Sequence, residues 1–300
     1  MKLLITGAFH CTEAELKTLS DMENEVLFMQ NERDALPCNP EEIEGVICNG
    51  LFLHHDIKEF AALKFIQLTS AGFDRVPMEY IKEKGIEIYN ARGVYSVPIA
   101  EFTLCSVLEL YKQSRFFMKN QKEHKWEKHH SLLELSGKTV AIIGAGSVGT
   151  ECAKRFSSFD TTVLAVDIAK PDGACFDEFF PFENIKTAIS RSDIVVLTLP
   201  LTPKTKGIFD EDMLSCFKEN SVLVNMARGQ IVDENALISA LNSGRLQGAV
   251  LDVFCEEPLP ADSPLWDMEN VIITPHNSFV GEGNNARLFE VIKTNLKNKI

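Results

Sequence analysis

Short apolar runs alternate with helical stretches along most of the chain, and they do so in two separate series. The first series, up to about residue 96, consists of KLLIT, EVLFM, EGVIC, LKFIQLTS and IEIYN. The second series begins at GKTVAIIG and continues through TTVLAVD, DIVVLTLP, SVLVNMA, GAVLDVF and NVIITPH. Strands that alternate with helices are typical of βαβ units and therefore of parallel sheets. We predict an α/β protein with two doubly wound parallel-sheet domains, each with its own core.

The boundary between the two domains is expected where this pattern is interrupted. A long helix is predicted from about Ile99 to Lys119, followed by the polar stretch KNQKEHKWEKHH. The last helix of the chain is amphipathic, so it needs an apolar surface to cover, and we expect it to return to the first domain. This predicts a first domain at 1–97, completed by 283–300, with the second domain at 98–282 inserted into it.

Composition and charge exclude several classes of protein. With 300 residues, of which 45% are hydrophobic and 24% charged, the chain can form two cores. Its formal net charge of −13 would repel a phosphate backbone, so we expect no nucleic-acid partner. The opening MKLLITGAFH is too short an apolar stretch for a signal segment or a membrane span. The eight cysteines show no CxxC pair or zinc-type spacing, which predicts reduced thiols in a cytoplasm and no metal site.

A glycine motif follows the first strand of the second series. Gly144, Gly146 and Gly149 form a GxGxxG directly after the apolar run TVAII, and the motif opens a helical pattern. In this context the first glycine permits a tight turn, the second admits a pyrophosphate, and the third allows the helix to pack on the strand. The amides at Ser147 and Val148 would then face the anion at the helix N-terminus. The alternative is a glycine-rich turn that binds nothing.

The next strand ends on Asp167, where a carboxylate can accept both hydroxyls of an adenosine ribose. The same carboxylate would repel a 2′-phosphate, so the motif predicts NAD as the cofactor, with NADP less favoured. Lys170 is the feature that argues in the other direction.

Three further strands of the second series end on residues that can carry chemistry. Arg228 follows SVLVNMA, Glu257 lies just beyond GAVLDVF, and His276 ends NVIITPH. Ligands of open α/β sheets bind outside the carboxyl ends of the strands, so we expect these side chains to face one crevice. Taken singly, Arg228 could form a structural bridge to Asp233, Glu257 could be a solvated turn residue, and His276 a loop histidine.

With these residues in place, the chain resembles the D-isomer-specific 2-hydroxyacid dehydrogenase family over nearly its whole length. The matching stretches are LTSAGFDRVP (68–77), NARGVYSVPIAEFTL (90–104), LSGKTVAIIGAGSVG (135–149), LPLTPKTKGIFD (199–210), NMARGQIVDENAL (225–237), GAVLDVFCEEPLP (248–260) and SPLWDMENVIITPH (263–276). The resemblance implies a Rossmann NAD-binding domain inserted in a flavodoxin-like substrate domain, with a homodimer formed through the NAD-binding domain.

The resemblance also assigns roles to single residues. It implies a catalytic trio at Arg228, Glu257 and His276 and a contact from Asp252 to the nicotinamide carboxamide. Backbone amides near Ala71 and Gly72 are implied to hold the substrate carboxylate. By the same resemblance, Pro200 and Ala227 are expected to contact the cofactor.

The reduction of a 2-keto acid requires residues of these types. A guanidinium can hold a carboxylate with paired hydrogen bonds and polarise the adjacent ketone. A histidine can donate a proton to the ketone oxygen and take it back in the reverse direction. A neighbouring carboxylate would favour the charged imidazolium and fix which ring nitrogen faces the substrate. The nicotinamide supplies the hydride.

The substrate and two alternatives stay open. Phosphoglycerate dehydrogenases of the family hold the substrate phosphate with basic side chains, whereas the loop at 48–57 has no Arg or Lys. This favours a small unphosphorylated 2-keto acid, although Arg75 and Arg92 could still contact a phosphate. A formate dehydrogenase is disfavoured because that group pairs its histidine with glutamine, and this chain has Glu257. A binding protein of corepressor type that senses NAD(H) without turnover is the alternative from another class.

Overall fold

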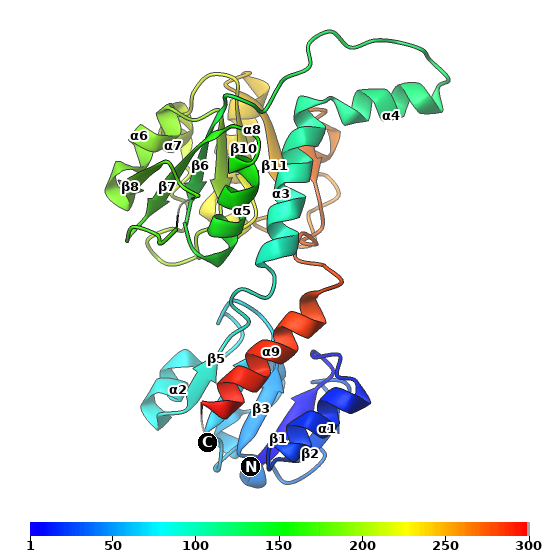
Figure 1. Cartoon of the computed structure of the whole chain (residues 1–300), viewed down its shortest axis with the longest axis vertical. Helices are drawn as coiled ribbons and strands as arrows, with labels where there is room; N and C mark the ends of the chain where they lie inside the picture. The colour runs from blue at the N-terminus through cyan, green and yellow to red at the C-terminus, as the bar shows by residue number, and fades with distance from the viewer. Residues whose placement is uncertain (174, 299–300) are drawn as a thin grey trace. The chain divides into compact units, whose positions relative to one another are not determined.

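The computed structural model describes residues 1–173 and 175–298, and the chain divides into two compact units. Unit 1 comprises Met1–Tyr95 and Gly281–Ile300, and unit 2 comprises Ser96–Val280. In Figure 1, unit 1 carries the blue and cyan segments together with the red helix α9, and unit 2 carries the segments from green to orange. Each unit contains one parallel sheet with helices on its faces, which confirms the predicted fold class.

The sheet of unit 1 has five parallel strands in the order β2-β1-β3-β4-β5. This is the flavodoxin-like order, in which the strand sequence reverses between β1 and β3. The strands are β1 (Lys2–Thr6), β2 (Glu25–Met29), β3 (Gly45–Cys48), β4 (Phe65–Leu68) and β5 (Glu87–Tyr89), and the helices are α1 (Glu13–Asp21), α2 (Met78–Lys84) and α9 (Asn284–Lys297), with short 3₁₀ turns η1 (Pro40–Glu42), η2 (Leu51–Leu53) and η3 (Ile57–Glu59).

Apolar side chains cover both faces of this sheet. On one face, strand residues such as Ile66 pack with Ile81 of α2. On the other face, Leu3 of β1 packs in one cluster with Leu288 and Ile292 of α9, which are buried. The C-terminal helix is therefore part of the core of unit 1, because its apolar face covers strands from the beginning of the chain.

The sheet of unit 2 has seven parallel strands in the order β12-β11-β10-β9-β6-β7-β8. The direction of winding reverses between β6 and β9, which makes this the switch point where an open α/β sheet binds its ligand. The strands are β6 (Thr139–Ile143), β7 (Thr162–Asp167), β8 (Glu178–Pro181), β9 (Ile194–Leu197), β10 (Ser221–Asn225), β11 (Leu246–Leu251) and β12 (Val271–Ile273). The helices are α3 (Ser96–Tyr111), α4 (Ser114–Lys122), α5 (Ser147–Ser157), α6 (Ile185–Ser190), α7 (Glu211–Ser215) and α8 (Glu234–Asn242), with 3₁₀ turns η4 (Phe182–Asn184), η5 (Gly229–Ile231) and η6 (Pro264–Asp267).

Two apolar clusters flank the sheet of unit 2. Val107 of α3 and Phe156 of α5 belong to the cluster on one face. Leu214 of α7 and Leu237 of α8 belong to the cluster on the other face. The strands between them, such as β6, are buried along nearly their whole length, which explains their continuous apolar sequences.

The single helix predicted at 99–119 is wrong, because the structure has two helices there. α3 ends at Tyr111, and Gln113 adopts a left-handed conformation with φ of 52° before α4 begins. The returning chain holds this break: Leu133 donates its amide to Tyr111 O at 3.1 Å, and Lys112 Nζ donates to Leu133 O at 2.6 Å. Helical periodicity records only neighbours within a few residues, so it could not predict a break that depends on contacts with Leu133.

The second of these helices lies apart from the core of its unit. Figure 1 shows α4 and the loop after it extending away from the sheet of unit 2. Apolar side chains of α4 and of the loop after it are exposed, with relative exposures of 40% for Phe117, 57% for Met118 and 100% for Trp126. These residues are available for contact with another surface.

Strand β8 was missed by the sequence prediction. Its sequence EFFP is short, ends on proline and forms the edge of the sheet, where it pairs with β7. All eight cysteines are free thiols. Within the described ranges 1–173 and 175–298, no group of His, Cys, Asp and Glu side chains is arranged to hold a metal ion. In the same ranges, none of the helices has both the length and the apolar character that a membrane span requires.

Candidate active site

The register of the central strands of unit 2 places their carboxyl ends along one edge of the sheet. Ile143 at the end of β6 pairs with Leu197 at the end of β9. Leu197 in turn pairs with Asn225 of β10. Asn225 pairs with Leu251 of β11, which pairs with Ile273 of β12. Because neighbouring strands lie about 4.8 Å apart, the residues that follow these strands form one continuous row.

Every site residue predicted from Gly144 onward belongs to unit 2 and lies along or just beyond this edge. The glycine motif follows β6, Asp167 ends β7, Pro200 follows β9, Ala227 and Arg228 follow β10, Asp252 and Glu257 follow β11, and His276 follows β12. The predicted carboxylate-binding residues Ala71 and Gly72 follow β4 and belong to unit 1.

The glycine motif has the geometry that a dinucleotide-binding turn requires. Gly144 has φ of 100°, and a Cβ there would lie 2.6 Å from the amide nitrogen of Leu199. A Cβ on Gly149 would lie 2.2 Å from Gly144 O, so α5 can approach β6 only with glycine at this position. A Cβ on Gly146 would meet no heavy atom within 4 Å. The first and third glycines are thus required by packing, whereas the second leaves open space.

This space lies at the start of α5, which has no side-chain cap. The amides of its first turn, from Ser147 and Val148 onward, are therefore available to an anion, and the helix dipole favours negative charge there. Asp167 lies beside the same turn, since its two carboxylate oxygens accept hydrogen bonds at 2.7 Å from the amides of Ala145 and Ile168. The residues fit a dinucleotide whose pyrophosphate contacts the turn and whose ribose lies near Asp167.

The chain after β10 holds Arg228 in a defined backbone position. Asn225 accepts the Ala227 amide on its side-chain oxygen at 3.1 Å and donates its side-chain nitrogen to Arg228 O at 3.1 Å. The guanidinium donates to Ala227 O at 2.7 Å and is half-buried. Glycine must follow, because a Cβ on Gly229 would lie 1.9 Å from the carbonyl carbon of Phe254. The glycine after Arg228 is therefore required by a close backbone contact between the segments that follow β10 and β11.

Glu257 and His276 form a hydrogen-bonded pair. His276 Nδ1 lies 2.8 Å from Glu257 Oε2, and Glu257 Oε1 accepts the Phe254 amide at 3.1 Å. An ionised carboxylate only accepts hydrogen bonds, so it keeps the proton on Nδ1 of the ring. The histidine side chain has a relative exposure of 41%. Its Nε2 is the ring nitrogen left for a ligand, which is the arrangement an acid/base histidine needs.

Asp252 holds the loop on which His276 lies. It is 1% exposed and accepts hydrogen bonds from Thr274 Oγ1 at 2.6 Å, the Asn277 amide at 2.8 Å and Ser278 Oγ at 2.5 Å. His276 itself has φ of 49°, a left-handed conformation that a residue other than glycine adopts at a cost of about 1–3 kcal/mol. The bonds to Asp252 on both sides of the histidine offset this cost. In the structure, then, Asp252 anchors the histidine loop.

In unit 1, Ala71 and Gly72 present two adjacent backbone amides after β4. Neither amide donates to another residue of the described chain, while the carbonyl oxygens of both are held: Ala71 O by Asn90 Nδ2 at 2.6 Å and Gly72 O by Ser70 Oγ at 3.0 Å. Tyr95 OH also donates to Thr69 O, and burial raises the pKa of this tyrosine. Adjacent amides with no acceptor in a fixed loop can bind a carboxylate.

Sequence analysis missed several residues that position the predicted site residues within each unit. They are Asn225, Thr274 and Ser278 in unit 2 and Asn90 in unit 1, each of which holds a predicted site residue or its loop. Asn225 and Thr274 lie within three residues of Arg228 and His276 in the sequence. The position of these polar residues, at or just beyond the end of an apolar strand, could therefore have been used to predict that they hold the site. Their hydrogen-bond partners could not have been predicted in this way.

Comparison with known proteins gives consistent results. The family model "D-isomer specific 2-hydroxyacid dehydrogenase, NAD binding domain" matches residues 104–278. A hydroxypyruvate reductase from Thermotoga maritima is 34% identical over 270 residues, which cover 88% of this chain and 87% of the relative. A D-3-phosphoglycerate dehydrogenase from Methanocaldococcus jannaschii is 33% identical over 280 residues, 92% of this chain but only 53% of that protein, so the chain spans about half of its length.

Solved structures agree with these relatives. The structure of an NAD-dependent formate dehydrogenase from Staphylococcus aureus in complex with NAD superposes with a TM-score of 0.75 and 27% identity, over 99% of this chain and 95% of that one. The three proteins named here are a reductase and two dehydrogenases. The chain belongs to the D-isomer-specific 2-hydroxyacid dehydrogenase family, and the matched residues 104–278 are its NAD-binding domain.

Proposed function

We propose that the protein is an NAD-dependent oxidoreductase that interconverts a small D-2-hydroxy acid and the corresponding 2-keto acid. The observation that carries this proposal is the Glu257–His276 pair on the same sheet edge as Arg228 and the glycine motif. Unit 1 would bind the substrate and unit 2 the cofactor. Bound NADH would supply the hydride that reduces the keto carbon.

Arg228 and the loop of unit 1 would hold the substrate's charge. The half-buried guanidinium of Arg228 can donate two parallel hydrogen bonds to the carboxylate and polarise the neighbouring ketone. The amides of Ala71 and Gly72 would also donate to the carboxylate, and they need no rearrangement because the carbonyl oxygens of the same two residues are already held. Fixed donors stabilise developing charge without reorganisation during the reaction.

His276 would act as the acid and base. In the direction of reduction, its Nε2 gives a proton to the ketone oxygen as the hydride reaches carbon, and in oxidation it takes the hydroxyl proton back. Glu257 fixes the ring through Nδ1 and stabilises the positive charge of the protonated ring. Asp252 acts here as a positioning residue for the histidine loop. Its contact with the nicotinamide carboxamide, and those of Pro200 and Ala227 with the cofactor, stay predictions.

An unphosphorylated substrate is supported by the structure of unit 1. The side chain of Glu32 lies at the switch point between β1 and β3, where it accepts Thr6 Oγ1 at 2.8 Å and the amides of Asn49 and Gly50 at 2.6 and 2.7 Å. An internal carboxylate therefore occupies the donors that a phosphate would use, and its charge would repel one. Leu53, on the same loop, is 61% exposed and available to an apolar substrate group.

We also propose that the protein forms a homodimer through unit 2 and works in the cytoplasm. The exposed Phe117, Met118 and Trp126 on α4 and its loop support the dimer, since they expose apolar area that a second copy would cover. The eight free thiols support a reducing compartment. The carboxylate of Asp167 beside the glycine motif supports NAD over NADP.

The decisive experiment follows NADH absorbance with a panel of 2-keto acids, among them glyoxylate, hydroxypyruvate and 3-phosphohydroxypyruvate. We expect turnover with an unphosphorylated member. Arg228→Ala should lower kcat/KM by at least about a hundredfold, because a charged hydrogen bond to the substrate is lost, while NADH binding is retained. Arg191→Gln, which removes an ion pair with Glu178 on the edge strand β8, is the matched control and should leave kcat/KM unchanged.

Tight NADH binding with no turnover across the panel would instead support a sensing protein. For the substrate class, Glu32→Gln should raise kcat/KM for 3-phosphohydroxypyruvate relative to hydroxypyruvate by roughly tenfold, because it removes one negative charge near the substrate. Glu41→Gln, on an exposed turn, is the control for this change. An unchanged ratio in Glu32→Gln would contradict the assignment of Glu32.

A further inference from the structure

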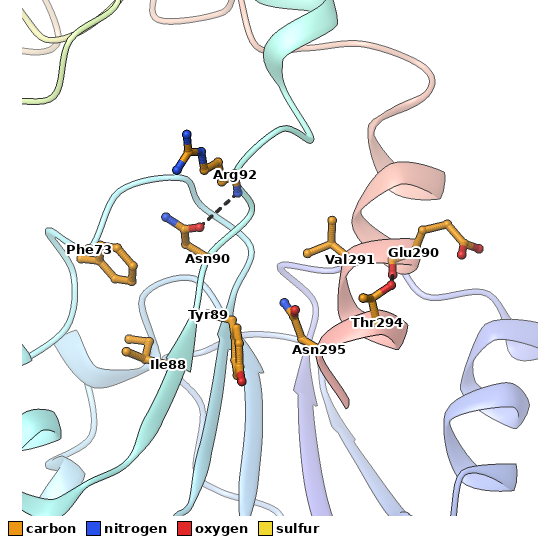
Figure 2. A pocket seen from close by; sticks show the side chains of 9 residues that line it. All are labelled: Phe73, Ile88, Tyr89, Asn90, Arg92, Glu290, Val291, Thr294 and Asn295. Atoms are coloured by element: carbon orange, nitrogen blue, oxygen red, sulfur yellow. Dashed lines mark hydrogen bonds between the residues drawn. The ribbon is translucent and has the colours of Figure 1, made fainter. Parts of the chain in front are cut away.

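A further candidate site lies in unit 1 and contains none of the residues proposed for the reaction. It is a pocket of about 500 Å³ between the edge strand β5 and helix α9. Ile88 and Tyr89 of β5 and Val291, Thr294 and Asn295 of α9 are among the residues that line it. Figure 2 shows Tyr89 on the side of β5 that faces Val291 and Asn295, with Ile88 and Phe73 on the other side of the strand. Pockets of this size accommodate small organic ligands.

The walls of this pocket are fixed by contacts within unit 1. The ring of Tyr89 packs on Phe65 of the core, with centroids 5.6 Å apart. Asn295 donates to the buried side chain of Gln67 at 2.7 Å. Ile88, Tyr89 and Val291 are each half-buried, so part of their apolar surface is exposed and can contact a ligand. A ligand would therefore meet a formed apolar surface.

The two charged side chains that line the pocket differ in whether another residue neutralises their charge. Glu290 lies 2.7 Å from Lys293, and Figure 2 shows its carboxylate directed away from β5. Arg92 is exposed, and its guanidinium makes no hydrogen bond or ion pair with any residue in 1–173 or 175–298. An exposed arginine changes rotamer within nanoseconds, so it can turn over the opening. The pocket thus combines an apolar surface with one cation that lacks a counter-ion.

The pocket is also connected to the loop at 70–73. Asn90 lies in its wall and donates to Ala71 O at 2.6 Å, and the Ala91 amide donates to Ser70 O at 2.9 Å. Phe73, which also lines the pocket, directly follows Gly72 in the chain. A ligand that contacts Phe73 and Asn90 can therefore change the position of the two amides proposed to bind the substrate carboxylate.

We propose that this pocket binds a small organic carboxylate with an apolar or aromatic body, and that its occupancy alters the affinity for the 2-keto acid. The carboxylate pairs with Arg92, since a guanidinium binds this group bidentately. The body of the ligand packs against Phe73, Tyr89 and Val291. The effect on the 2-keto acid rests on the proposed function of Ala71 and Gly72, whereas the binding itself does not.

The binding experiment uses 3-phenylpropanoate, which has no keto or hydroxyl group to be oxidised or reduced, and the neutral 3-phenylpropanamide as its matched analogue. Calorimetric titration of the whole protein should show binding of the acid and at least about tenfold weaker binding of the amide, equivalent to about 1.4 kcal/mol. Arg92→Gln should weaken the binding of the acid by a similar factor. Val291→Trp fills the pocket and should abolish binding, with thermal melting used to confirm that this variant is folded.

Arg228→Gln separates this pocket from the proposed catalytic site and should leave the affinity for 3-phenylpropanoate unchanged. The proposal would be overturned if the wild type bound the acid and the amide equally, or if it did not bind the acid at all. It would also be overturned if Arg92→Gln bound the acid as tightly as the wild type, or if Arg228→Gln lost this binding. In the NADH assay, 3-phenylpropanoate should shift KM for the 2-keto acid in wild type but not in Arg92→Gln. If no keto acid is turned over, the proposed function fails while the titration still decides the pocket.

Discussion

The glycine motif allows a test in which two similar substitutions should have opposite effects. Gly149→Ala places a methyl group 2.2 Å from Gly144 O, and ordinary contact begins at 3.4 Å. Helix α5 must therefore move by about 1 Å, and overpacking of this kind typically costs about 1–3 kcal/mol. For a domain the size of unit 2, a loss of about 2 kcal/mol lowers Tm by about 4–8 °C. Gly146→Ala meets no atom within 4 Å and should leave Tm of the unliganded protein unchanged.

The shift in Tm caused by NADH should instead be reduced in Gly146→Ala and retained in Gly149→Ala. At an NADH concentration of about 100 times the wild-type Kd, binding stabilises the wild type by about 2.7 kcal/mol. The methyl group of Gly146→Ala projects into the space expected for the pyrophosphate, so we expect about tenfold weaker binding and a stabilisation of only about 1.4 kcal/mol. Melting of both variants by circular dichroism, with and without NADH, measures all four values. A Gly146→Ala variant that melts low without NADH, or a Gly149→Ala variant that melts like wild type, would refute the packing argument.

Two other predictions address residues around the proposed catalytic pair. Asp252→Ala leaves the hydroxyls of Thr274 and Ser278 without their buried acceptor, so urea unfolding should show a loss of about 3–5 kcal/mol, and a loss below about 1 kcal/mol would contradict its anchoring role. Burial, and secondarily the charges of Glu234 and Asp233, raise the pKa of the Cys255 thiol. Its alkylation by iodoacetamide should therefore be slow near neutral pH and accelerate only as pH rises above the pKa of a free cysteine, and Cys255→Ser should keep kcat/KM within about twofold.

Most of the secondary structure could be read from local pattern because each buried strand is a continuous apolar run. β1 and β2 coincide with the runs KLLIT and EVLFM, and α9 lies within the last amphipathic stretch. The exceptions share a physical cause. Strand β8 is a short edge strand stabilised by one neighbour, and the break between α3 and α4 is held by Leu133, so in both places distant contacts decide the structure.

The amino-acid sequence alone determined the fold class, the family and the types of residue that can bind a dinucleotide and move a proton, because these depend on periodicity and on short motifs. Only the tertiary structure decided the partners of those residues. It directs Asp252 to the histidine loop and places Glu32 on the amides after β3. Hydrogen bonds between residues far apart in the chain exist only once the strands are in register, so no local pattern records them.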